Sequence, residues 1–356
     1  MIEAKTKISD EPLPELLGPA TLSQGSGRLR ETVLDEGWNY HERDLLVAES
    51  FHATEGEPFR EIRVAKAIAH LMAEMPIRIR EGEILVGWHP NTKLEGERVY
   101  ALAAINHLQA RENYRGFCSE GHMAPDYPTT LASGLDGVLA RIDRAALALD
   151  PEEPETARKR VFYEAARIAL TGFQQFIERY AELAATMAAE ADDPDWADEL
   201  REISRVCEHI AHAPARNSRE ALQLSWFMFL GCSLENSGHH HCFGPGRIDQ
   251  WLHPYVLAER GAGDLDEALL DDLLAQYLIK CNEFSGPSMS AVILVIGGRK
   301  PDGADATNEL SFKILEIADR VRTYFPGIDV SWHSDMDPEF VRQCVALLRY
   351  TNGQPS

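Results

Sequence analysis

The sequence predicts an α/β fold in which a helix-rich envelope surrounds a partial sheet. Late in the chain an apolar run, 291–296, and a second strand candidate, 328–332, alternate with segments of helical periodicity, an order typical of α/β folds. The first run is unbroken and ends at Gly297, as expected of a strand that is buried on both faces. A long helical pattern over 155–189 supplies part of the envelope.

The N-terminal part is predicted to be an arm followed by helices and one strand. Residues 1–27 are rich in Pro, Gly, Ser and Glu, which favours a flexible arm, so we expect the folded domain to span 28–356. Helical periodicity begins near Arg28 and is clearest over 59–75. The apolar run 83–87 then predicts a short buried strand.

Helices are predicted through the middle of the chain. The loop 121–127 precedes a helix over 131–149, and further helices are expected at 155–189 and 196–212. The segment 218–234 is apolar on nearly every side, so we expect it to be buried all round. The apolar stripe of the 155–189 helix is interpreted as core packing and consists of Phe162, Ala166, Ala169, Phe173, Phe176 and Tyr180.

Acidic residues mark the starts of the later helices. Asp264 is predicted to cap one helix, and Asp305 is predicted to cap another over 306–322. Asp337 precedes a proline and an acid, a combination that marks the start of the last helix.

Composition limits the classes of partner. The chain has 356 residues, ample for a core, and a net charge of -22. An acidic surface repels phosphates, which argues against nucleic acid and anionic membranes. The six cysteines form no CxxC pair, the N-terminus lacks the apolar core of a signal peptide, and no run reaches the length of a membrane span. We therefore expect a cytoplasmic protein with reduced thiols.

Polar residues follow the buried run 222–234 directly. The stretch 235–250 begins with Glu235 and contains three consecutive histidines and Cys242. Burying such groups is unfavourable unless each finds a partner, and clusters of this kind are often functional. This stretch is therefore the candidate site.

Short blocks from about Arg28 onward occur in a recognisable order. In that order they are Ala48-Glu49-Ser50 with Pro58, Ile79 and Glu83 with Ile84-Leu85-Val86-Gly87, Gly121-His122 with Pro125-Asp126-Tyr127, Pro214-Ala215-Arg216 with Glu220-Ala221-Leu222-Gln223, Glu235-Asn236 with Gly238-His239, Arg247-Ile248-Asp249-Gln250 with Pro254-Tyr255, Gly297-Gly298 with Asp302-Gly303 and Asp305-Ala306-Thr307-Asn308-Glu309-Leu310, and Asn352-Gly353-Gln354-Pro355-Ser356. Together they resemble the glycyl radical enzymes, the group that includes pyruvate formate-lyase and the glycerol, diol and choline lyases.

The resemblance implies a fold and a chemistry. In this family two half barrels of parallel strands form one barrel wrapped by helices, and the chain resembles the N-terminal half of such an α/β barrel. A glycine radical near the C-terminus oxidises a central cysteine, whose thiyl removes a hydrogen atom from the substrate. The expected function is that of a lyase or dehydratase acting on a small polar metabolite in anaerobic metabolism. A dry cavity is needed because water and loose thiols destroy radicals.

The resemblance also implies partners. A separate activase with an iron–sulfur cluster and S-adenosylmethionine installs the glycyl radical, so no cofactor is expected to bind this chain directly. A homodimer is expected. None of the six cysteines stands in the context of the catalytic cysteine. The chain is therefore expected to be truncated before the catalytic cysteine and the radical glycine, and to be inactive alone.

The family pattern assigns site residues individually. His122 and His239 match positions that hold substrate, and His240 stands where the diol-type enzymes often carry a serine. These three histidines are the predicted substrate-binding residues. Arg247 and Asp249 are interpreted as structural residues near the site. No metal site is expected.

The histidine cluster admits other interpretations. In an extended segment His239 and His241 share one face, and His240 and Cys242 share the other. A metal-dependent hydrolase with a further ligand from elsewhere is therefore an alternative, as is a structural polar cluster bonded to backbone. Cys242 could be a nucleophile, although a buried cysteine is more often inert. A non-catalytic half barrel that serves as a binding or regulatory module is the second function considered.

Overall fold

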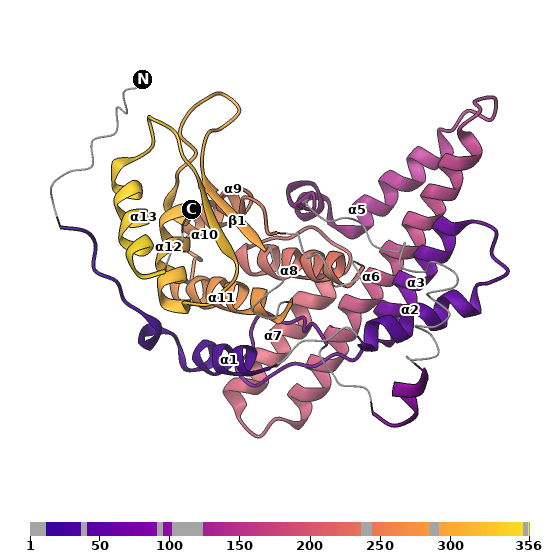
Figure 1. The fold of residues 1–356 in the computed structure, drawn as a ribbon, viewed down its shortest axis with the longest axis horizontal. Helices are drawn as coiled ribbons and strands as arrows, with labels where there is room; N and C mark the ends of the chain where they lie inside the picture. Colours follow the sequence, from indigo (N-terminus) through magenta and orange to yellow (C-terminus); the bar gives the residue numbers. More distant parts are fainter. Residues whose placement is uncertain are drawn as a thin grey trace.

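The computed structural model describes residues 12–36, 41–90, 95–101, 124–235, 244–284, 292–351 and Pro355. Over these ranges the chain is helix-rich, with a small parallel sheet in its C-terminal third (Figure 1). The helices are η1 (Pro19–Thr21), α1 (Gln24–Asp35), α2 (His41–Ala53), α3 (Arg60–Glu74), α5 (Tyr127–Leu147), α6 (Thr156–Glu190), α7 (Pro194–Ile210), α8 (Ser218–Glu235), α9 (Ile248–Trp251), α10 (His253–Ala262), α11 (Glu267–Lys280), η3 (Cys281–Phe284), α12 (Glu309–Val321) and α13 (Pro338–Thr351), and the strands are β1 (Ile293–Gly297) and β2 (Gly327–Ser331).

Helix α6 is the long element of the helical half, and α3 and α7 pack along it (Figure 1). The predicted helix over 155–189 is confirmed, and Phe176 and Tyr180 of its apolar stripe are buried. The prediction is wrong for Phe162, which is 60% exposed. Near that end of α6 the face that packs on α3 carries Ala165 and Val161, so Phe162 lies one position off the buried face.

Helix α8 lies in the core between the helical half and the sheet (Figure 1). The prediction of burial all round is confirmed by Trp226, Phe227 and Phe229, each 0% exposed. The Trp226 ring contacts Phe229 and the ring of Tyr277 on α11, with centroids 5.6 and 5.3 Å away. Such aromatic packing contributes stability beyond simple area burial.

Strands β1 and β2 form a parallel pair, with Ile293 opposite Gly327 and Gly297 opposite Ser331. Helix α12 connects them, as the predicted alternation of strands and helices requires. On its other side β1 forms a bridge through Leu294 with Gly246. The expected burial of this strand on both faces is wrong at Ile293, which is 41% exposed, although Leu294 and Ile296 are fully buried.

The predicted strand at 83–87 is not a strand, although Leu85 and Val86 are fully buried as expected. Two glutamine side chains supply the partners that a neighbouring strand would supply. Gln276 Oε1 accepts the backbone N–H of Ile84 at 2.8 Å and of Leu85 at 3.2 Å. Gln223 accepts from Val86 N–H at 2.9 Å and donates to its carbonyl at 2.7 Å. The buried backbone is thus satisfied without a sheet.

Two predicted helix caps are also wrong. The N-cap of α11 is Asp266, whose carboxylate accepts two backbone N–H groups, and not Asp264. The N-cap of α12 is Asn308, and Asp305 instead accepts from Thr307 and from Asp337 N–H. In both cases a second capping residue closer to the helix satisfies its free N–H groups, which lie within the first turn.

The N-terminal segment packs on the C-terminal elements. Helix α1 begins at Gln24, four residues before the predicted start, with Ser23 as its cap. The Asp319 carboxylate of α12 accepts the N–H groups of Leu17 and Gly18 at 2.5 and 3.0 Å.

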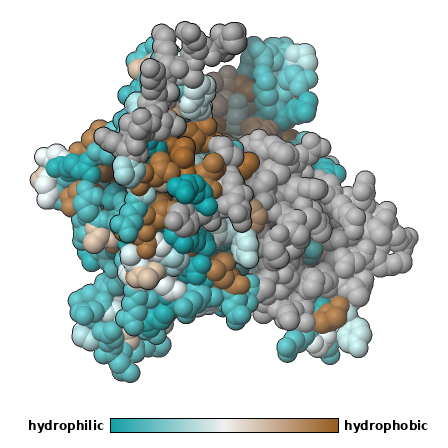
Figure 2. Space-filling view, turned by 60° about the vertical axis from the view of Figure 1, so that its left-hand side comes forward, coloured by the Kyte–Doolittle hydropathy of each residue, from teal (hydrophilic) through white to brown (hydrophobic). Residues whose placement is uncertain are grey.

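On the side that carries α12 and α13, Figure 2 shows hydrophobic residues gathered in a patch among hydrophilic ones. Within the described ranges, no helix has both the length and the apolar character needed to cross a bilayer.

Candidate functional site

The three predicted substrate histidines, His122, His239 and His240, lie outside the described residues, as do His241 and Cys242. The structure describes the residues that flank them. Ala124 follows the first segment, and the second lies between Glu235 at the end of α8 and Gly244. The candidate site is therefore characterised by the side chains that hold these flanking residues.

Arg43 of α2 holds the upstream flank of the second segment. Its side chain is buried, and its Nε and Nη2 donate to the carbonyl oxygens of Leu234 and Glu235, each at 2.5 Å. These carbonyls belong to the last turn of α8, and a cation placed at the C-terminal end of a helix complements its dipole. Burial raises the pKa of the Glu235 carboxyl, and Arg43 opposes that shift.

Two aromatic residues hold the downstream flank. The Tyr127 hydroxyl at the start of α5 donates to the carbonyl of Gly244 at 3.2 Å, and the Trp251 indole of α9 donates to the carbonyl of Pro245 at 2.9 Å. The two rings stack with centroids 5.3 Å apart. Gly244 itself lies against β1, where a Cβ would collide with the Ile293 carbonyl oxygen, so only glycine fits this close approach.

Arg247 and Asp249 hold the carboxyl end of β1. Arg247 donates to the carbonyls of Gly297 and Arg299, the latter at 3.2 Å. Asp249 is fully buried and accepts the N–H of Gly297 at 2.8 Å and the hydroxyl of Ser311 at 2.7 Å. Burial raises the pKa of the Asp249 carboxyl, and these two hydrogen bonds oppose the shift. Both side chains therefore bond to the framework in the part of the chain that the structure describes.

A buried ionic cluster, which sequence reasoning missed, joins the segment after α3 to the end of α11 and to η3. Lys280 contacts the carboxylates of Glu83 and Glu283, the latter at 3.3 Å, and Arg80 contacts Glu283 at 2.7 Å. Burial alone would raise the pKa of Glu283, but Lys280 and Arg80 hold it below its usual range. The N–H of His89 donates to Glu283 at 3.1 Å. The available sequence signal was Glu83, a charged residue directly before the apolar residues 84–86.

Burial lowers the pKa of His89 to about 4, so its ring is neutral near pH 7. Burial raises the pKa of Cys232 to about 12, so the described thiol nearest the candidate stretch is protonated and is no activated nucleophile. Neither group in this buried region is prepared for acid–base chemistry at neutral pH.

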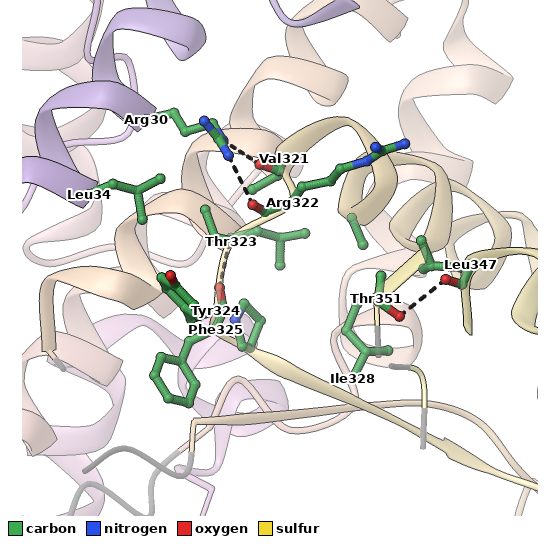
Figure 3. Close-up of a pocket in the computed structure, with 13 residues that line it drawn as sticks. Arg30, Leu34, Val321, Arg322, Thr323, Tyr324, Phe325, Ile328, Leu347 and Thr351 are labelled. Carbon is green, nitrogen blue, oxygen red and sulfur yellow. Dashed lines mark hydrogen bonds between the residues drawn. The ribbon is translucent and has the colours of Figure 1, made fainter. Parts of the chain in front are cut away.

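One cavity lies away from the candidate site, between α1, the end of α12 and α13 (Figure 3). It encloses about 390 Å³ and is lined by Leu278 and Phe325 among others. The Arg30 guanidinium points to its rim and donates to the carbonyls of Val321 and Arg322 at 2.5 and 3.0 Å (Figure 3). These bonds link α1 to the end of α12, so the arginine has a structural role there.

A second cavity adjoins the candidate site. It encloses about 500 Å³ between the start of α5 and the helices α9 and α10, and Tyr127, Arg247 and Trp251 contribute to its wall. Its lining is mostly apolar, with Tyr255 and three prolines among the other residues.

Comparison with known proteins gives consistent results. A family model described as "Pyruvate formate lyase-like" matches residues 105–356. The Escherichia coli (strain K12) protein named "Probable dehydratase YbiW" is 31% identical over 270 residues, covering 72% of this chain and 33% of its own length. The (2S)-3-sulfopropanediol dehydratase of Klebsiella oxytoca is 28% identical over 255 residues, covering 68% of this chain and 31% of its own length.

A solved structure has the same fold. The glycerol-bound form of the B12-independent glycerol dehydratase from Clostridium butyricum superposes with a TM-score of 0.87 at 22% identity, covering 98% of this chain and 51% of that chain. The chain thus spans about a third of the length of the two sequence relatives and about half of the solved one. The expected α/β architecture of a partial barrel with a helical envelope is confirmed by this likeness.

Proposed function

We propose that this chain, which belongs to the pyruvate formate lyase-like family of glycyl radical enzymes, forms the substrate-holding part of a dehydratase or lyase. The substrate is a small hydroxylated metabolite. The observation that carries the proposal is the family match over 105–356, which includes both histidine segments. Two relatives named as dehydratases support the choice of reaction. The activity proposed is that of the whole protein, and the chain spans about half of the solved relative.

The proposed reaction begins when a substrate C–H bond gives its hydrogen atom to a cysteine sulfur radical, so that S–H forms and a carbon radical remains. The hydroxyl on that carbon loses its proton to a base. The neighbouring hydroxyl leaves with its bonding electron pair and takes up a proton, departing as water. The resulting carbon radical takes the hydrogen atom back from S–H, which gives a carbonyl product and restores the sulfur radical.

His122, His239 and His240 are proposed to hold the substrate hydroxyl groups and to donate the proton that the leaving hydroxyl takes up. Histidine suits this role because its ordinary pKa, about 6.5, allows both proton donation and acceptance near neutral pH. The described residues contribute a rigid, largely apolar support. Arg43 and Tyr127 hold the flanks of the histidine segment by backbone contacts.

The proposal includes the family's partners. A radical-generating activase with an iron–sulfur cluster supplies the glycyl radical to the complete protein, which we expect to be a cytoplasmic homodimer. Its intact mass, measured from the native source, is expected to be about twice that of the 39.8 kDa chain, as the 51% coverage of the solved relative indicates.

The test uses the complete protein, activated without oxygen and supplied with a panel of small diols and hydroxylated acids. His239→Ala is expected to reduce turnover by at least about 100-fold, the usual effect of losing a group that transfers protons in the reaction. His52→Ala is the matched control, because this histidine is 79% exposed on α2, and turnover in it is expected to equal that of wild type. Wild-type turnover in His239→Ala would rule out the assignment of that residue.

A further inference from the structure

Tyr127 connects two segments that are far apart in the sequence. It is five residues after His122, and its hydroxyl donates to Gly244, which is four residues after His240. The bond spans 117 positions of the chain and is buried. Tyr127 is the first residue of α5. Asp126 caps this helix, and its carboxylate accepts the N–H of Thr129 at 3.2 Å. The hydroxyl therefore projects from a fixed helix start.

Trp251 reinforces the same connection from a third element. Its indole holds the carbonyl of Pro245, the residue after Gly244, and its ring stacks on Tyr127 with an interplanar angle of 29°. Both rings are buried, with exposed fractions of 1% for Tyr127 and 7% for Trp251. Two consecutive carbonyls are thus held by donors whose rings stack on each other, so that neither donor moves independently.

The Tyr127 hydroxyl is a permanent donor. Burial, with Tyr277 and Cys232 nearby, raises the pKa of Tyr127 well above its ordinary value, so the hydroxyl keeps its proton at every physiological pH. A buried carbonyl that loses its donor is left unsatisfied, and the local backbone then shifts to find another partner. Displacements of about 1 Å in a site lower rates by about 100-fold when substrate must face the reacting atom in one orientation.

We propose that Tyr127 and Trp251 are positioning residues that fix the start of α5, five residues after His122, relative to Gly244 and Pro245, which follow His240 by four and five residues. The inference rests on the proposed function. It adds Tyr127 and Trp251 to the predicted site residues. Arg43 completes the arrangement at the other flank, where it holds the last two carbonyls of α8. The eight residues between Glu235 and Gly244 are thus held at both ends by buried donors.

The experiment compares Tyr127→Phe with Tyr180→Phe in the complete, activated protein. Each substitution removes one buried phenolic oxygen, and Tyr180 is a matched control because its hydroxyl bonds to the backbone of another segment, where it accepts the N–H of Trp88 at 2.8 Å. Both variants are expected to show a similar loss in thermal midpoint. Only Tyr127→Phe is expected to lower kcat/KM, by about tenfold or more, with a normal glycyl radical signal by electron paramagnetic resonance.

Hydrogen exchange provides a readout that needs no turnover. Backbone amides in peptides covering 236–247 are expected to exchange at least threefold faster in Tyr127→Phe than in Tyr180→Phe, and Trp251→Phe is expected to have the same direction of effect. Equal exchange in the two tyrosine variants, or equal losses in kcat/KM, would overturn the positioning role. If exchange differs as expected while the activated wild-type protein turns over no hydroxylated substrate, the proposed function fails and the connection between the segments remains.

Discussion

Glu83 and Lys280 lie 197 positions apart in the chain, and the buried ammonium of Lys280 donates to the buried carboxylate of Glu83. Both side chains are 0% exposed, so each would be strongly destabilised without the other. Lys280 also faces the Trp226 ring of α8, 5.4 Å from its centroid. The pair joins the segment after α3 to the end of α11 and thereby supports the helix that leads to the candidate site.

Replacing Lys280 with Met is predicted to lower the free energy of unfolding by about 3–5 kcal/mol, because Glu83 and Glu283 lose a buried cation. Urea unfolding monitored by circular dichroism measures the change. The control is Lys159→Met, in which the lost pair with Glu153 is at the surface, and its midpoint is expected to match wild type. Equal midpoints for the two variants would contradict the role assigned to the buried cluster.

Stability is predicted to fall in acid because of His89. Burial, with Arg43 adding to it and Glu283 opposing it, lowers the pKa of His89 to about 4. A histidine with a lowered pKa in the folded state binds protons more readily when unfolded. Its contribution to stability is therefore complete above about pH 6.5 and is lost as the pH falls toward 4, by about 3 kcal/mol.

The measurement is the free energy of unfolding of wild type and His89→Leu at several pH values between 7 and 4.5. The substitution removes the titrating group, so the free energy of unfolding of wild type minus that of His89→Leu is expected to decrease as the pH falls. Parallel curves would show that His89 does not titrate with a lowered pKa. Comparing the two proteins removes the contribution of carboxyl groups that titrate over the same range.

Replacing Gln276 with Leu is predicted to lower the free energy of unfolding by about 2–4 kcal/mol, because the N–H groups of Ile84 and Leu85 lose their acceptor. Gln343→Leu is the control, since its side chain makes one bond to the Phe312 carbonyl at 3.2 Å, and its effect is expected to be about 1 kcal/mol or less. Chemical denaturation of both variants tests this, and a smaller loss for Gln276→Leu than for the control would refute it.

Local periodicity was sufficient to predict the long helices. The 155–189 pattern corresponds closely to α6, and the apolar run before the candidate stretch corresponds to α8. The alternation of runs that predicts β1 and β2 also holds. These elements are recognisable because each buries a face whose spacing is determined by its own geometry.

Long-range partners limited the remaining predictions. The run 83–87 has the composition of a strand, yet its backbone is satisfied by Gln223 and Gln276, whose side chains are 137 and 192 positions away. No local pattern reveals such a partner. For the candidate site, the bonds of Arg43 to α8 and of Tyr127 to Gly244 have the same character. The roles of His122, His239 and His240 stay predictions, because they rest on the family pattern.

The dependence of 83–87 on Gln276 has a consequence for protein synthesis. The amides of Ile84 and Leu85 cannot reach their acceptor until the ribosome has added a further 191–192 residues. At ordinary translation speeds of roughly 5–20 residues per second this interval is about 10–40 s. Throughout that time a segment that is buried in the folded protein lacks the acceptor of its Ile84 and Leu85 amides. A chaperone that binds short apolar stretches has access to it on the nascent chain.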